Sequence, residues 1–349
     1  MALVQHYPAL SPPDSPVCSV CIANYNGVAL LADCIESVLA QQGGMSVEIL
    51  VHDDASTDGS VSWLREHYPQ VELLASSENV GFCVSNNRMA ERARGGYVLL
   101  LNNDAALQPD ALETLLREAT QSLQAGIFTL PQYDWTSGAL VDRGCLLDPF
   151  YNPVPNLDPS RTDVAMVIGA CLFLPRALWN ELGGFPEWID SIGEDLYLCC
   201  IARLRDVPVR AVVRSGYRHR QGASFGGNRA GDFGLHTTYR RRALSERNKT
   251  AVMAICTPPP LAWLLLGAHI ALLAVEGILL SLLRLDWRIW GRIYGAALTY
   301  AIRAPFTLRQ CRCEVQATRR INLRTYLHAF TWVPRKLSLL WRHGVPRVR

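Results

Sequence analysis

Residues 17–27 have the sequence Val-Cys-Ser-Val-Cys-Ile-Ala-Asn-Tyr-Asn-Gly, in which seven apolar or small residues are followed by a polar cluster. A short apolar run that ends in turn-forming residues is typical of a strand buried on both faces of a sheet. The spacing then becomes helical over 30–41, where Ile35, Val38 and Leu39 fall on one side. This order predicts the first strand–helix unit of an α/β sheet.

The same unit recurs along the next hundred residues. Further strands are predicted over 47–51, 71–75 and 97–101, and further helices over 59–67, 84–93 and 109–121. Strands separated by helices of this length indicate a parallel sheet, in which ligands bind beyond the carboxyl ends of the strands.

A polar cluster follows each of the four predicted strands. One such cluster is ordinary turn chemistry, but four at equivalent positions indicate a single polar ligand. The clusters are Ala23-Asn-Tyr-Asn-Gly27, His52-Asp-Asp-Ala-Ser-Thr-Asp-Gly59, Asn79-Val-Gly-Phe82 and Asn102-Asn-Asp-Ala105.

With Gly183-Gly-Phe185 and Gly193-Glu-Asp-Leu196, these clusters make the chain resemble family 2 glycosyltransferases over roughly residues 17–220. Within that family the chain is most similar to bacterial rhamnosyltransferase-like enzymes of surface-polysaccharide assembly. The resemblance implies a GT-A fold, an α/β nucleotide-sugar-binding domain with a mainly parallel sheet. We expect this domain over 17–250, after a Pro-rich leader at 1–16 and before a helical, Arg-rich region at 251–349.

The donor is expected to be a nucleoside-diphosphate sugar of the UDP or dTDP type. Asp53 or Asp54 could accept a hydrogen bond from the imide N–H of uracil or thymine, and Tyr25 could stack on the base. The resemblance favours Asp54, and the alternative for the other aspartate is an Asx turn before Ser56. The predicted donor-binding residues are Tyr25, Asn26, Asp53, Asp54, Gly81, Asn87, Asn102, Asn103, Arg218 and Arg220.

Asn102-Asn-Asp104 stands where the family usually has Asp-x-Asp, a motif that holds Mg²⁺ or Mn²⁺ beside the donor phosphates. The first carboxylate is replaced by an amide, so Asp104 would bind metal more weakly, with diphosphate and water completing the coordination. The resemblance makes His219 a second candidate ligand, although a lone histidine is commonly structural. Arg218 and Arg220 could instead bind the diphosphate directly.

Glu194 and Asp195 match the acidic pair that supplies the family's catalytic base. The resemblance assigns Asp195 as the base and Glu194 as the partner that contacts the acceptor or tunes the pKa of Asp195. The alternative is an acidic N-terminus for a helix over 196–204. Trp188 could line the acceptor pocket or simply pack in the core.

The distribution of charge divides the chain into two regions, and its cysteines indicate the cellular compartment. From Arg284 onward there are 14 basic and 2 acidic residues, whereas the whole chain carries only +3, so the first 283 residues are acidic. Eleven cysteines and no apolar segment in the first 16 residues indicate a reducing compartment and no cleavable signal peptide. Cys18 and Cys21 would point to opposite faces of one strand, which argues against a shared metal.

The segment 261–283 is long and apolar enough to cross a bilayer, with Glu276 as its single formal charge. Basic residues on both flanks argue against one crossing and favour a re-entrant or interfacial helix. Arg284, Arg288 and Arg292 then recur at helical spacing, as in an amphipathic helix at a membrane surface rich in anionic lipid. A soluble helical dimerisation region is the alternative, and no nucleic-acid-binding motif accompanies the basic residues.

These observations predict an inverting, metal-dependent glycosyltransferase at the cytoplasmic face of the inner (plasma) membrane, acting on a lipid-linked or glycan acceptor. A catalytically weak scaffold that binds nucleotide sugar is the alternative, because the metal motif lacks its first carboxylate. A nucleotidyltransferase is disfavoured, since no Gly-rich, Lys-containing phosphate loop is found near the N-terminus. The sequence leaves the oligomeric state open.

Overall fold

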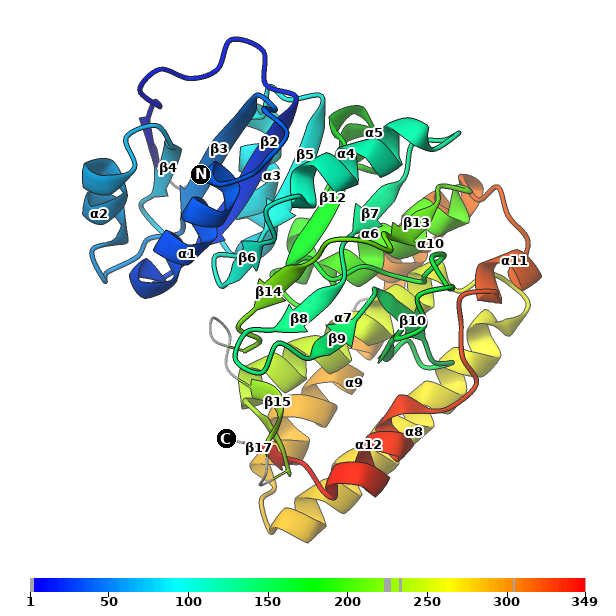
Figure 1. The fold of residues 1–349 in the computed structure, drawn as a ribbon. Helices are drawn as coiled ribbons and strands as arrows, with labels where there is room; N and C mark the ends of the chain where they lie inside the picture. Colours follow the sequence, from blue (N-terminus) through cyan, green and yellow to red (C-terminus); the bar gives the residue numbers. More distant parts are fainter. Residues whose placement is uncertain (1–2, 223–226, 232–233, 304, 349) are drawn as a thin grey trace.

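The computed structural model describes residues 3–222, 227–231, 234–303 and 305–348, and its centre is an eight-stranded mixed sheet (Figure 1). The strands follow the order β1-β4-β3-β2-β5-β12-β7-β13. Their bounds are β1 (Val4–Tyr7), β2 (Cys18–Asn24), β3 (Val47–Asp53), β4 (Glu72–Ser76), β5 (Tyr97–Leu101), β7 (Ile127–Thr129), β12 (Cys171–Pro175) and β13 (Val209–Ala211).

The four strands expected from the sequence, β2 to β5, are parallel to one another. Beyond β5 the sheet is mixed, because β12 runs antiparallel to both β5 and β7. The α/β fold is therefore confirmed, with a mixed sheet whose strands β2, β3, β4 and β5 are parallel.

Helices cover both faces of the sheet and build two hydrophobic clusters. Cys18 and Cys21 belong to different clusters, so they do lie on opposite faces of β2. All eleven cysteines are unpaired thiols. One face carries α1 (Val28–Leu39), α2 (Ser60–His67) and α4 (Ala111–Gln121), and the other carries α3 (Phe82–Arg92), α5 (Arg176–Leu182) and α6 (Glu194–Leu204).

A second, four-stranded sheet of order β6-β14-β8-β9 is formed by segments that follow the main strands. Its register places His219 opposite Ala105, the residue after Asp104. The remaining short elements here are β6 (Ala105–Leu107), β8 (Gln132–Asp134), β9 (Leu140–Asp142), β10 (Cys145–Leu147), β11 (Pro153–Pro155), β14 (Tyr217–His219) and the 3-10 turn Glu187–Ile189.

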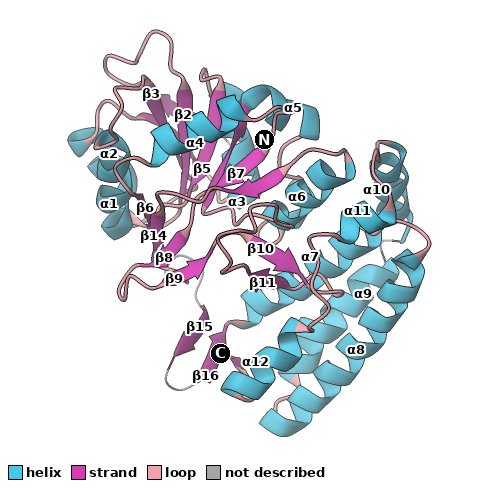
Figure 2. Ribbon diagram, turned by 45° about the vertical axis from the view of Figure 1, so that its right-hand side comes forward, coloured by secondary structure: helices cyan, strands magenta, loops and turns pink. Residues whose placement is uncertain are grey.

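The C-terminal third is a layer of helices beside the α/β domain (Figure 2). Its first helix, α7, packs on α6 and continues through the boundary that we predicted at residue 250. The elements are β15 (Gly227–Gly231), β16 (Gly234–Thr237), α7 (Tyr239–Cys256), α8 (Leu261–Arg284), a π-helical turn (Trp290–Tyr294), α9 (Gly295–Arg303), α10 (Pro305–Ala317), α11 (Leu323–Leu327), α12 (Arg335–His343) and β17 (Arg347–Val348).

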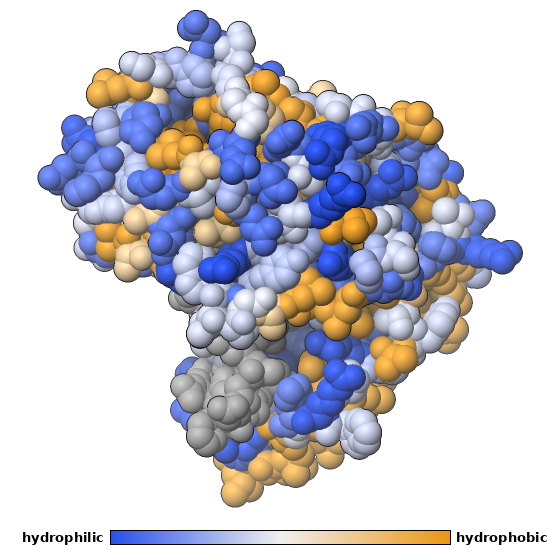
Figure 3. Space-filling view, in the orientation of Figure 1, coloured by the Kyte–Doolittle hydropathy of each residue, from blue (hydrophilic) through white to orange (hydrophobic). Residues whose placement is uncertain are grey.

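Among the described residues, α8 is the one helix long and apolar enough to cross a membrane, judged by length and composition alone. Its inner face packs on α7, the π-helical turn and α9. Its outer face is exposed and apolar, with Trp263, Leu264 and Leu283 each about two-thirds exposed. Apolar side chains gather along the lower edge of the helical layer in Figure 3.

Two segments show structure that the sequence did not predict. Part of the Pro-rich leader forms β1, which pairs antiparallel with β4 because an edge strand offers unpaired backbone groups. The amphipathic pattern after Arg284 is not one helix: α8 ends there, Leu285 is left-handed with φ 52°, and the chain turns before the next helix. The buried positions Ile289 and Ile293 then face the protein.

Candidate active site

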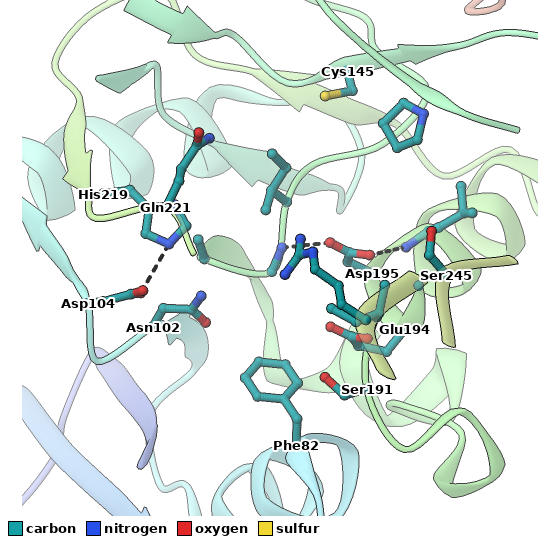
Figure 4. A pocket seen from close by; sticks show the side chains of 18 of the residues that line it. Phe82, Asn102, Asp104, Cys145, Ser191, Glu194, Asp195, His219, Gln221 and Ser245 are labelled. Atoms are coloured by element: carbon teal, nitrogen blue, oxygen red, sulfur yellow. Dashed lines mark hydrogen bonds and ion pairs between the residues drawn. The ribbon is translucent and has the colours of Figure 1, made fainter. Parts of the chain in front are cut away.

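The carboxyl ends of β2, β3 and β5 open into one cleft of about 880 Å³. Polar side chains from all three strand ends line it, together with residues of β14, α6, α7 and α12. Figure 4 shows Asn102, Asp104 and His219 on one side of this cleft and Glu194 and Asp195 across from them. The cleft therefore combines the two groups of residues that the sequence motifs predicted.

A buried polar network fixes the floor of the donor side. The Asn24 side-chain N–H donates to Asp53 Oδ2 at 2.8 Å, and Asn24 Oδ1 accepts from the Asn103 amide at 2.8 Å. Gly27 lies so close to this pair that an added Cβ would collide with both asparagine side chains. Asn103 and Asn102 line the cleft, as predicted.

Asp53 does not line the cleft, contrary to our prediction. It is fully buried, and its Oδ1 accepts the Ser56 backbone N–H at 2.9 Å. This bond to a backbone N–H three residues on gives Asp53 a local structural role, like that of the Asx turn that we considered as the alternative for one of the two aspartates. Its role is to hold the loop after β3.

Asp54 does line the cleft, and it also positions the loop before α3. Its two oxygens accept the backbone N–H groups of Val80 (2.7 Å) and Gly81 (2.9 Å). Burial raises the pKa of Asp54, and these two hydrogen bonds oppose that shift. Tyr25, at 53% exposure, forms part of the same wall and is free to move against a base.

Three predicted donor-binding residues lie elsewhere. Asn26 Oδ1 accepts from the Thr57 N–H at 2.7 Å, and Asn87 makes two hydrogen bonds to the backbone of Phe185. Arg218 is exposed and points away from the cleft, because it alternates with the buried Tyr217 and His219 along β14. The structure therefore does not bring these three side chains to the cleft, because the two asparagines hydrogen-bond to other backbone groups and Arg218 lies on the outer side of β14.

Arg220 lies on the cleft wall, as predicted, and it is held in place. Its guanidinium lies 3.8 Å from the centre of the Trp135 ring and bonds to Asp33 Oδ2 at 2.6 Å. The sequence motifs gave no indication of Trp135, which follows β8 and enters the site through tertiary contact.

Asp104 and His219 meet, as a shared metal site requires. His219 Nε2 lies 3.0 Å from Asp104 Oδ1, and His219 Nδ1 lies 3.2 Å from Gln132 Oε1. If Nδ1–H donates to Gln132, Nε2 carries a lone pair beside the Asp104 carboxylate, and both groups would be available to hold a divalent cation. These residues therefore fit Mg²⁺ or Mn²⁺.

The protein supplies only part of such a coordination shell. Within the described ranges no cluster of three or more histidine, cysteine, aspartate or glutamate side chains could hold a metal. Diphosphate and water oxygens would complete the shell, as expected from the amide at Asn102.

Glu194 and Asp195 begin α6, and both line the cleft. Asp195 Oδ2 accepts the Gly169 N–H at 3.0 Å and Oδ1 accepts the Leu196 N–H at 2.7 Å, whereas Glu194 Oε2 has no hydrogen-bond partner among the described residues. Burial, with the Asp195 charge added, raises the pKa of Glu194 to about 8. Burial also raises the pKa of Asp195, against the effect of its two N–H donors.

This arrangement gives the pair different chemistry. Glu194 is mainly protonated at neutral pH, and Asp195 retains its charge more readily because two backbone N–H groups stabilise it. A fixed carboxylate at the edge of a cleft suits proton abstraction from a bound hydroxyl. The helix N-terminal role that we considered is real as well, since both residues lie in the first turn of α6.

Arg241 of α7 was not predicted as a site residue, although it lies in the sequence Tyr239-Arg-Arg-Arg242. It lines the cleft within electrostatic range of Glu194, Asp195 and Asp104, whose charges oppose the lowering of its pKa by burial. Trp188 does not line the cleft and instead packs edge-on against Tyr197. Of the two roles considered for Trp188, packing is the observed one.

Comparison with known proteins supports the motif assignment. Residues 19–177 match the model for "Glycosyl transferase family 2". The chain is 31% identical over 188 residues to the chondroitin synthase of Escherichia coli, covering 52% of this chain and 26% of that protein. It is 27% identical over 183 residues to an N-acetylglucosaminyl-diphospho-decaprenol L-rhamnosyltransferase of Mycobacterium tuberculosis, covering 44% and 59%. The chain thus spans less than two thirds of the length of either relative.

Solved structures show the same fold. A crystal structure of GalNAc-T7 with UDP, GalNAc and Mn²⁺ aligns with a TM-score of 0.62 at 12% identity, over 96% of this chain and 59% of that one. The mannosyltransferase PcManGT from Pyrobaculum calidifontis, in complex with GDP-Man and Mn²⁺, aligns with a TM-score of 0.51 at 17% identity, over 86% and 90%. The α/β domain has the GT-A fold.

Proposed function

From the match of residues 19–177 to the family 2 glycosyltransferase model, we propose that the chain transfers a sugar, with inversion, from a UDP or dTDP sugar to a lipid-linked or glycan acceptor of surface-polysaccharide assembly. The observation that carries the proposal is the shared cleft, which joins Asp54, Asp104 and His219 to the buried pair Glu194 and Asp195. Rhamnose is one candidate sugar, by similarity to the mycobacterial rhamnosyltransferase.

Asp195 takes the proton of an acceptor hydroxyl in the proposed reaction. The freed oxygen forms a bond to C1 of the donor sugar on the face opposite the diphosphate, and the C1–O bond to the diphosphate breaks with its electron pair leaving on the diphosphate. Arg220 lies where it can stabilise this negative charge. Protonated Glu194 donates a hydrogen bond to the acceptor without adding a second negative charge beside Asp195.

Mg²⁺ or Mn²⁺, held by Asp104 and His219, would add a Lewis acid beside the departing diphosphate. The two structural relatives that contain Mn²⁺ support a divalent cation here. Removing the His219 imidazole, in a His219→Ala variant, should weaken Mn²⁺ binding at least tenfold in a direct titration followed by electron paramagnetic resonance.

The proposed location is the cytoplasmic face of the inner (plasma) membrane, with α8 lying in the interface. The exposed apolar face of α8 and the excess of basic residues after Arg284 support it. Helices α7 and α9 pack along the inner face of α8, which favours an interfacial position over a single crossing.

The decisive experiment compares Asp195→Asn with wild-type protein. Thermal shift with UDP, dTDP and GDP, with and without Mn²⁺, first identifies the nucleotide, and transfer from the matching nucleotide sugar to membrane-extracted acceptor is then measured. We expect Asp195→Asn to retain nucleotide binding while transfer falls 10²- to 10⁴-fold, the range for loss of a general base.

Asp206→Asn is the matched control, because Asp206 follows α6 and does not line the cleft. If Asp195→Asn transfers at the wild-type rate, Asp195 is not the base. If no nucleotide with Mn²⁺ stabilises the wild-type protein, the proposed donor site is wrong. A binding-only scaffold would bind nucleotide but give no transfer in either protein.

A further inference from the structure

The cleft continues beyond Glu194 and Asp195 to the C-terminal helices. Arg335, Lys336, Leu339 and His343 of α12 line it, with Glu246 and other residues of α7. Positions 335, 339 and 343 are four residues apart, so one face of α12 forms this part of the wall. This arm is separate from the donor end at Asp54 and Asp104, and the proposed reaction leaves it without a role.

Part of the basic charge in this arm is neutralised within the protein. Glu246 is buried and pairs with Lys249 at 2.8 Å and with Lys336 at 2.7 Å. Lys336 also pairs with Glu276 of α8 at 2.6 Å, and Arg242 pairs with Glu276 at 2.6 Å. This network fixes α12 against α7 and α8, so the wall is rigid.

Arg335 and Arg241 do not belong to this network of ion pairs. Both line the cleft and are half-buried, yet within the described part of the chain neither guanidinium forms an ion pair. Burial lowers the pKa of both guanidinium groups, because removing their positive charge from water costs free energy that nearby negative charges only partly offset. A partly desolvated guanidinium that faces a cleft is stabilised by an anionic ligand, and phosphate oxygens match its planar set of donors.

The other face of α12 is apolar and exposed. Leu337 is 63% exposed and Trp341 is 90% exposed, and Leu340 lies beside them. The α8 helix, which also has exposed apolar side chains, is joined to α12 by the Lys336–Glu276 ion pair, and the two helices lie together in Figure 1. The arm of the cleft that Arg335 lines therefore ends beside an exposed apolar surface, which suits contact with lipid chains.

We propose that Arg335, together with Arg241, binds the diphosphate of a lipid-linked acceptor, whose lipid chain passes over Leu337, Leu340 and Trp341. The proposal rests on the proposed function and specifies its acceptor class. The acceptor sugar, attached to this diphosphate, then extends along the cleft toward Asp195. A glycan acceptor without phosphate would offer neither guanidinium group an anionic ligand.

The test uses the full chain with its donor site saturated by nucleoside diphosphate and Mn²⁺, so that added diphosphate cannot bind there. Farnesyl diphosphate, farnesol and inorganic pyrophosphate are titrated separately by isothermal calorimetry below micelle-forming concentrations. We expect farnesyl diphosphate to bind at least tenfold more tightly than either of the other two, because only it offers both the charge and the apolar chain.

Arg335→Gln should weaken farnesyl diphosphate binding 10- to 100-fold, the value of one or two charge-assisted hydrogen bonds. Arg342→Gln is the matched control, because Arg342 is on the same helix, is exposed and does not line the cleft. Arg335→Lys should recover part of the affinity. A folding defect is detected by the melting temperature, and the Arg335 backbone N–H bond to Asp148 at 2.8 Å is retained in every variant.

Each outcome supports or overturns the proposal. Equal loss in Arg335→Gln and Arg342→Gln, or no loss in either, overturns it. If pyrophosphate binds as tightly as farnesyl diphosphate, the site takes free anions. If farnesol binds as tightly, the site is apolar. Either result overturns the proposal that the arm binds a lipid-linked diphosphate. Failure of the proposed function is seen separately, as absence of nucleotide binding in the saturation step.

Discussion

Replacing Glu194 with glutamine should change how the stability of the protein depends on pH. Glu194 is buried at the start of α6, and burial together with the Asp195 charge raises its pKa from 4.5 to about 8. A carboxyl group with a raised pKa in the folded state holds its proton more tightly there than in the unfolded chain. Its contribution to stability is complete below pH 4.5 and is lost as pH rises through about 8.

The size of this effect follows from the two pKa values. Each tenfold difference in proton affinity corresponds to about 1.4 kcal/mol, so ionising Glu194 in the folded protein costs about 5 kcal/mol by pH 9. Glutamine keeps the shape of the protonated side chain and cannot ionise. The free energy of unfolding of Glu194→Gln should therefore exceed that of the wild type by several kcal/mol more at pH 9 than at pH 5.

Urea denaturation followed by tryptophan fluorescence at half-unit steps from pH 5 to 9 measures the difference. Glu187→Gln serves as the control, because Glu187 is exposed and lies seven residues earlier in the same region. The acid limb of the transfer rate should stay at the same pH in this variant, because Glu194 is already protonated and uncharged in that pH range.

The reasoning is refuted if the wild-type and Glu194→Gln stability curves run parallel from pH 5 to 9. Glu194 would then have an ordinary pKa, and the assignment of a protonated partner beside Asp195 would be lost. A stability difference between Glu194→Gln and wild type that grows toward acid pH would also refute the reasoning, because it has the opposite sign to the expected one.

Three other expected outcomes test separate parts of the structure. Gly27→Ala should weaken nucleotide binding at least tenfold by thermal shift, whereas Gly267→Ala should not, because a Cβ at Gly27 meets the Asn24–Asn103 pair and one at Gly267 meets nothing. Arg220→Gln should weaken nucleoside diphosphate binding about tenfold and Arg218→Gln should leave it unchanged, since only Arg220 lines the cleft; equal effects would contradict the strand alternation in β14. Replacing Leu337 and Trp341 together by serine should reduce flotation with anionic vesicles several-fold, and vesicle binding that is unaffected would place the membrane contact elsewhere.

The sequence predicted the fold and the elements of the donor site because both depend on local patterns. The apolar runs at β2, β3, β4 and β5 are buried on both faces of a parallel sheet, and each is found within two residues of its predicted bounds. Parallel strands bring their carboxyl ends to one edge, so the polar clusters after them had to meet. Asp54, Asn102, Asn103 and Asp104 are in the cleft for that reason.

The sequence also predicted which face of the sheet a side chain occupies, where successive residues of a strand clearly alternate between the two faces. Cys18 and Cys21 lie on opposite faces of β2, as predicted. The same alternation, applied to β14, would have separated Arg218 from His219, but the strand is only three residues long and its pattern is hidden in the basic run around it.

Tertiary structure alone decided which polar residue faces the cleft and which supports it. Asp53 and Asp54 are adjacent and chemically identical, and their roles differ because Asn24 and Ser56 surround one while Val80 and Gly81 meet the other at the cleft. Asn26 and Asn87 are likewise held by backbone groups distant in sequence. Such partners are set by the packing of separate strands and helices, which local sequence does not encode.

The acceptor side depends most strongly on the tertiary structure. Arg241 and Arg335 are 94 positions apart and meet one cleft only because α12 returns to pack on α7 and α8 through the ion pairs of Lys336. From composition alone the C-terminal third was a basic, apolar segment beside an acidic domain. Its folding determined that Arg240, Arg241, Arg242 and Arg335 line the cleft, while exposed apolar side chains such as Trp263 of α8 and Trp341 of α12 remain outside it. A helix with two unlike faces satisfies both environments in that orientation.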